Sequence, residues 1–93
     1  MNATASIPTA SARRYLGQFV SHFAHKLTTA RDEANTHGEV NFPLGLCTLA
    51  ADETRLGIIV NAQTAEDLTK LEEIVDRHLL RFSFREALTI NWQ

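Results

Sequence analysis

Residues 56–82, LGIIVNAQTAEDLTKLEEIVDRHLLRF, decide the fold, because the repeat of their apolar residues changes from two to about 3.6. Leu56, Ile58 and Val60 alternate, which places them on one face of a strand. The run from Thr64 to Asp67 then supplies an N-cap hydroxyl and two acids in a first helical turn. The helix that follows has a single apolar stripe: Leu68, Leu71, Val75, Leu79 and Phe82. We therefore predict a strand followed directly by an amphipathic helix.

The same two repeats occur in the rest of the chain. A second amphipathic helix is predicted from Ala12, with Thr9 or Ser11 as its N-cap and an apolar stripe of Leu16, Phe19, Val20, Phe23 and Leu27. Short extended segments are predicted at Ala3–Ile7, Thr28–Ala34, Glu39–Phe42, Leu46–Ala51 and, from the alternation of Leu88, Ile90 and Trp92, at the end of the chain. In the turn over residues 35–38, Gly38 is expected to take a positive φ.

These elements predict an α+β fold, a two-layer sandwich. Two amphipathic helices pack on one face of an antiparallel sheet of four to six strands, in the order β-α-β-β-β(-β)-α-β. The chain of 93 residues, 44% of them apolar, is long enough for one such core, so residues 1–93 are expected to form a single domain. A deep internal cavity or a large active site is not expected at this size.

Composition also limits the compartment and the partners. The net charge of -2 disfavours sequence-independent binding to nucleic acid. The N-terminus lacks the pattern of a signal peptide, and the longest apolar stretch, Leu56–Val60, is far too short to span a membrane. A lone cysteine cannot form an internal disulfide, which favours a reducing compartment. We expect a cytoplasmic protein with no membrane partner.

The net charge hides an asymmetry along the chain. Residues 1–31 carry four basic residues and no acid, whereas residues 32–93 carry five bases and eleven acids. The simpler interpretation is that the basic first helix lies beside the acidic second helix, so that their surface charges complement each other. The alternative is a face for an anion or a partner, formed by Arg14, Gln18 and Lys26.

Four side chains are candidates for a metal site. His22 and His25 are three residues apart, which on a helix places both imidazoles on neighbouring positions of its largely polar face. His78 falls inside the apolar stripe of the second helix, and Cys47 shares a strand face with Leu49. If Cys47 and His78 face each other, a thiolate–imidazole pair, or a zinc or iron site with the first-helix histidines, becomes possible. Otherwise His78 is a hydrogen-bonded core residue and Cys47 a small hydrophobe.

Several segments, in this order and spacing, resemble a bacterial family catalogued as domain of unknown function 2218. They are Arg14–Leu16, His22 with His25–Lys26, Phe42–Cys47, Leu71–Glu72 with His78–Leu79, and Arg81–Glu86 before the Trp92 strand. The resemblance covers essentially the whole chain. Members occur as small stand-alone proteins and sometimes joined to siderophore-interacting flavin reductases, which implies a connection to iron handling but no catalytic or ligand residues. Members tend to have an aromatic residue such as Trp where this chain has Phe23, so a role that needs an indole does not carry over.

These observations favour a small, non-enzymatic binding or accessory module connected to iron or siderophore handling, with zinc or iron as its possible cofactor. The alternative is a protein-interaction module that binds a partner or its own copy without a small-molecule ligand. No residue is assigned a catalytic role. An enzyme would require Cys47 and His78 to lie within hydrogen-bond reach beside an open cleft.

Overall fold

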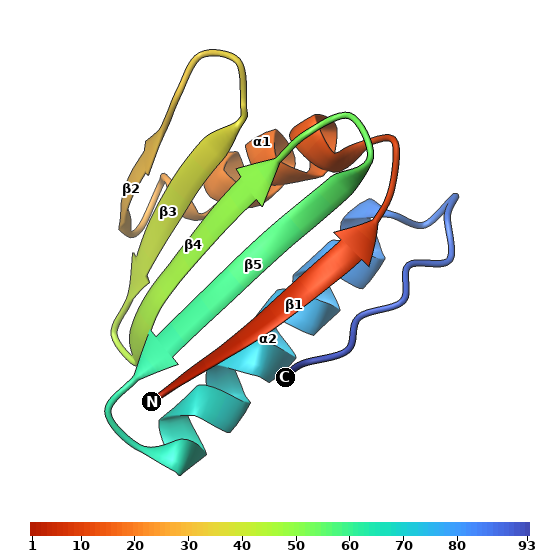
Figure 1. Ribbon diagram of the computed structural model, residues 1–93. Coiled ribbons are helices and arrows are strands. Elements are labelled where there is room, and N and C mark those ends of the chain that lie inside the picture. Colours follow the sequence, from red (N-terminus) through yellow and green to blue (C-terminus); the bar gives the residue numbers. More distant parts are fainter.

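The computed structural model describes all 93 residues as a five-stranded antiparallel sheet with two helices on one face (Figure 1). The elements are β1 (Asn2–Pro8), α1 (Ala12–Phe23), β2 (Thr28–Arg31), β3 (His37–Phe42), β4 (Gly45–Ala51), β5 (Arg55–Ala62) and α2 (Ala65–Phe82). The strand order is β1-β5-β4-β3-β2, so the N-terminal strand pairs with β5 and forms one edge of the sheet. The predicted α+β two-layer architecture is confirmed.

The strand and helix within residues 56–82 are as predicted. Burial alternates along β5, where Leu56, Ile58 and Val60 face the helices. The Thr64 hydroxyl accepts a hydrogen bond from the Asp67 amide at 3.1 Å, and α2 begins at the next residue, Ala65. The predicted stripe of α2 supplies three fully buried residues: Leu71, Val75 and Leu79.

Helix α1 is shorter than its apolar stripe. It ends at Phe23, because the amides of Lys26 and Leu27 both donate to the Phe23 carbonyl and form a tight turn. Leu27 still packs against the core, but from that turn. At the other end Ser11 occupies the N-cap position without a side-chain cap bond, and the Thr9 hydroxyl instead accepts from the Ser11 amide at 3.1 Å.

The connection between β2 and β3 differs from the prediction in two ways. Strand β2 ends at Arg31 rather than Ala34, because the Asp32 carboxylate accepts from the amides of Thr36 and His37 and closes the turn. The residue with positive φ is Asn35, at 59°, and not Gly38. Gly38 lies within β3, where an added Cβ would lie 2.9 Å from Val20 Cγ2 in α1. Close packing of α1 on β3 therefore explains this glycine.

The predicted strand at the end of the chain is wrong. Residues 87–93 form no strand, and their main-chain bonds to β1 are the two between Thr4 and Gln93, at 3.0 and 2.8 Å. Leu88, Ile90 and Trp92 are nevertheless half-buried against the core, while Thr89 and Asn91 are exposed. The alternation thus reflects one-sided packing of an extended tail. The observed element order ends with α2.

The core lies between the sheet and the helices. It is a cluster of 18 buried residues, which includes Tyr15, Leu16, Phe19 and Val20 of α1 and Cys47 of β4. Neither α1 nor α2 combines the length and the apolar composition that crossing a membrane requires.

Candidate functional site

The two helices bring His22 and His78 into contact. His22 lies on the last turn of α1 and His78 on the last turns of α2, and their ring centroids are 4.9 Å apart with an angle of 56° between the ring planes. His22 is exposed and His78 is half-buried. One imidazole therefore lies at the surface and the other just beneath it.

The hydrogen bond of His78 determines which of its nitrogens is free. Its Nδ1 lies 2.7 Å from the carbonyl oxygen of Ile74, one helical turn earlier. A carbonyl oxygen can only accept, so Nδ1 carries the proton and donates it, and in the neutral ring Nε2 keeps an unshared electron pair. A histidine that binds a metal typically donates its other ring N–H in this way. The prediction that His78 is hydrogen-bonded is thus confirmed, while its second nitrogen stays available as a ligand.

Phenylalanine rings surround the pair. The Phe23 ring centroid lies 4.8 Å from that of His78, and the Phe82 ring lies 5.7 Å from His22 and 6.3 Å from His78. Phe42 of β3 packs on Phe23 from the sheet side, at 4.8 Å. This packing lowers the pKa of His22 from its usual 6.5, chiefly through partial desolvation and then through the positive charges of His78, Arg81, His25 and Lys26.

The lowered pKa of His22 predicts that the protein loses stability as the pH falls. The unfolded chain takes up a proton below its ordinary pKa near 6.5, while folded His22 stays neutral until a lower pH, so the unfolded state binds more protons in that interval. The urea midpoint is expected to fall between about pH 7.5 and about pH 5.5 and to level off below the folded-state pKa. A His22→Gln variant should show a smaller decrease. A folded His22→Gln protein whose midpoint decreases as much as that of the wild type would contradict the prediction.

His25 does not share a helix face with His22. Because α1 ends at Phe23, His25 lies in the turn that follows, where it is exposed. The geometry expected of two histidines three residues apart on one helix is therefore lost. The partner that the fold gives His22 comes from α2 instead.

Cys47 does not join this pair in a group of possible metal ligands, and it lies inside the core. It is fully buried in β4, in register with Val40 on β3 and Val60 on β5. Burial raises the pKa of its thiol to about 12, so it is protonated at neutral pH. It makes no hydrogen bond to His78, whose ring bonds to Ile74. No group of three or more His, Cys, Asp or Glu side chains is placed to hold a metal ion, so the four predicted residues do not assemble as one site.

A second feature is a hollow of about 160 Å³ between α1 and the end of α2, which we call the arginine hollow. It is lined by Arg14, Tyr15 and Gln18 of α1 and by Phe82, Phe84 and Arg85. Two of the three residues of the predicted anion or partner face, Arg14 and Gln18, thus lie together. Lys26 does not line the hollow, because it belongs to the turn beyond the opposite end of α1.

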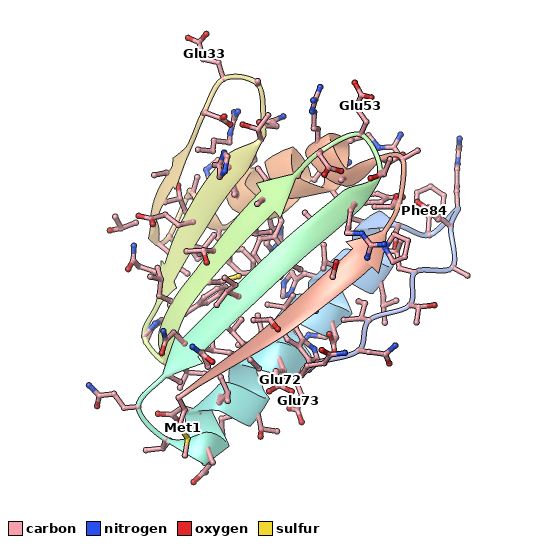
Figure 2. The ribbon with its side chains drawn as sticks, viewed as in Figure 1. Met1, Glu33, Glu53, Glu72, Glu73 and Phe84 are labelled. Carbon is pink, nitrogen blue, oxygen red and sulfur yellow. The ribbon has the colours of Figure 1, made fainter.

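Phe84 and Arg85, two of the six residues that line this hollow, were not among the predicted site residues. Phe84 and Arg85 follow α2, where no periodic pattern marks them, and Phe84 is 78% exposed just beyond the end of that helix (Figure 2). The available signal was the aromatic and basic run Arg81–Arg85. Its position beside Arg14 depends on how the two helices pack.

The expected complementarity between the helix charges does not take the form of ion pairs between the two helices. One ion pair forms in the whole chain, between Lys70 and Glu66 within α2 at 3.2 Å, and none joins α1 to α2. Figure 2 shows other acids elsewhere: Glu33 and Glu53 at hairpin tips, and Glu72 and Glu73 along α2. The basic residues Arg14 and Arg85 therefore face the hollow without a carboxylate as an ion-pair partner.

The comparisons with known proteins agree with this fold. No curated protein is significantly similar to the chain. Among solved structures, the chain is similar to the NMR structure of PA4090 from Pseudomonas aeruginosa, with 28% sequence identity and a TM-score of 0.82 over 99% of this chain and 94% of that one. Residues 4–93 match the model of a family described as an uncharacterized protein conserved in bacteria (DUF2218). Because that match covers almost the whole sequence, the chain belongs to this bacterial family.

Proposed function

We propose that this protein is a small non-enzymatic accessory module that binds a transition-metal ion through His22 and His78. The supporting observation is the contact between two imidazoles from different helices, with centroids 4.9 Å apart. Since a Zn–N bond is about 2.0–2.1 Å long, two imidazoles bound to one ion have ring centres about 5 Å apart. The bond from His78 to the Ile74 carbonyl leaves its Nε2 free to bind.

Two histidines leave coordination positions of a bound metal ion open, which indicates what form of the metal the protein binds. A structural zinc site normally has four protein ligands, and no third His, Cys, Asp or Glu joins this pair. An ion that arrives with ligands of its own, as a chelate with free positions, suits such a pair better. Imidazole binds zinc, copper, iron and nickel well, and the family resemblance favours iron or siderophore handling among these. The buried free thiol of Cys47 is in keeping with a reducing cytoplasm.

Metal titration of the purified, chelator-stripped protein tests this proposal. Zn²⁺, and Fe²⁺ under anaerobic conditions, are expected to bind saturably and to shift the ring signals of His22 and His78 in NMR spectra. His78→Ala should lower the affinity at least tenfold, which corresponds to about 1.4 kcal/mol. The matched control is His37→Ala, which removes a histidine from β3 and should bind like the wild type.

Two results would reject the metal proposal. One is the absence of any histidine shift up to millimolar metal. The other is a shift that persists unchanged in a folded His78→Ala protein, as judged by its backbone amide spectrum, because the ion would then be bound elsewhere.

Self-association is the alternative function, and one observation favours it. No helix covers the outer face of the sheet (Figure 1), and Ile59 on that face is 45% exposed. Sedimentation at two protein concentrations separates the two functions, since a module that acts only by metal binding stays monomeric at both. A rise in mass with concentration, abolished by Ile59→Thr, would favour self-association.

A further inference from the structure

We infer that the arginine hollow binds a small aromatic monocarboxylate, a ligand class distinct from the metal ion proposed above. The observation that carries this inference is the way its two arginines are held. The Arg14 guanidinium lies over the Tyr15 ring and that of Arg85 over the Phe84 ring, each 5.3 Å from the ring centroid. Aromatic stacking, rather than an ion pair with a carboxylate, orients both groups.

The charge in and beside the hollow suits a ligand with one negative charge. Arg14 and Arg85 contribute two positive charges to the lining. Glu86 follows directly, and its Oε1 accepts hydrogen bonds from the Tyr15 hydroxyl at 2.6 Å and the Thr9 hydroxyl at 3.0 Å. The sum of the three side chains is therefore +1, which one carboxylate neutralises. Guanidinium groups bind carboxylates through paired hydrogen bonds.

The hydrogen bond from Tyr15 to Glu86 also fixes the wall of the hollow that Tyr15 forms. Tyr15 is 1% exposed, and its hydroxyl has a raised pKa because of its burial and its bond to Glu86. The Tyr15 hydroxyl therefore donates its proton to Glu86 and does not donate it to a ligand. The polar groups that remain for a ligand are the two guanidinium groups and the Gln18 amide.

The size and the apolar lining of the hollow indicate an aromatic ring as the rest of the ligand. A volume of about 160 Å³ equals the space of about five liquid waters, enough for one ring with its carboxylate and too small for a folded peptide segment. Phe82 forms part of the wall. Phe84, which is 78% exposed, offers a ring that a second aromatic group can cover.

Benzoate is the probe for the first test. A titration followed by amide NMR shifts is expected to perturb α1 near Gln18 and the segment after α2. Arg14→Gln and Arg85→Gln should each weaken binding about tenfold or more, since each removes a charge-assisted hydrogen-bond donor. Arg13→Gln is the matched control: it removes the same charge one position earlier on α1, outside the hollow, and should bind benzoate like the wild type.

Related probes separate the carboxylate from the ring. Benzamide, which has the ring without the charge, and inorganic phosphate, which has charge without a ring, should both bind at least tenfold more weakly than benzoate. Phe84→Ala should weaken benzoate binding and leave the fold intact, because the side chain is mostly exposed. Zn²⁺ binding should be unchanged in Arg85→Gln, so the failure of either proposal is distinguishable from the failure of the other.

Several outcomes would overturn this inference. Benzoate binding that is equal in the wild type, Arg14→Gln and Arg85→Gln would exclude the hollow as its site. Phosphate binding as tight as that of benzoate would reduce the site to a general anion site. Absence of saturable binding of benzoate would reject the inference outright.

Discussion

Replacing Gly45 by alanine is expected to destabilise the protein by about 3 kcal/mol. Gly45 begins β4, directly after the two-residue turn Pro43-Leu44. An added Cβ would lie 2.0 Å from the Asn61 carbonyl oxygen and 2.9 Å from Leu71 Cδ1. The first of these is a backbone atom of β5, so the clash cannot be relieved by rotating a side chain. Either β4 and β5 separate at this end, or the main chain of residue 45 takes another conformation.

The measurement is the urea unfolding midpoint, with Gly57→Ala as the matched control. Gly57 lies in β5, and its added Cβ would meet nothing closer than the Ala50 carbonyl oxygen at 3.7 Å, an ordinary contact. The control should therefore change stability by less than about 1 kcal/mol. Equal midpoints for the two variants would show that the end of β5 moves to accommodate a methyl group.

Gly45 illustrates what could and could not be predicted from the sequence. Local features were sufficient for the strand and helix of residues 56–82, because alternation, the Thr64 cap and the stripe of α2 all act within a few residues. The sequence also shows a break at Pro43-Leu44-Gly45, but not why the third residue is glycine. That reason lies in Asn61, a residue that only the pairing of β4 with β5 brings close.

In the candidate sites too, local features could be predicted from the sequence, whereas contacts between distant elements could not. The position of His78 within the apolar stripe favoured a hydrogen-bonded core residue; the structure shows the hydrogen bond, to Ile74, but leaves the ring half-buried. Its contact with His22 depends on where α1 lies against α2, which no local pattern specifies. The prediction for His25 was wrong because a stripe that continued to Leu27 concealed the end of the helix at Phe23. Arg85 was missed because it follows the last periodic residue of α2.

Removing residues 88–93 is expected to cost about 3–5 kcal/mol, although these residues form no strand. The loss combines partial burial of Leu88, Ile90 and Trp92, the hydrogen bond from Trp92 Nε1 to Asp76 Oδ1 at 2.8 Å, and the two main-chain bonds to Thr4. Thr4 lies on the edge strand β1, so the tail also covers one position of an otherwise open sheet edge. The alternation that predicted a strand thus identified a segment that packs against the core.

A single substitution separates the contribution of packing from that of the hydrogen bond. Trp92→Phe keeps most of the apolar surface and removes the bond to Asp76, so it should cost about 1–2 kcal/mol. The urea unfolding midpoints of Trp92→Phe and of the truncated protein measure the two contributions. A truncated protein with wild-type stability would mean that α2 and β1 hold their positions without the tail, and that its burial contributes no net free energy.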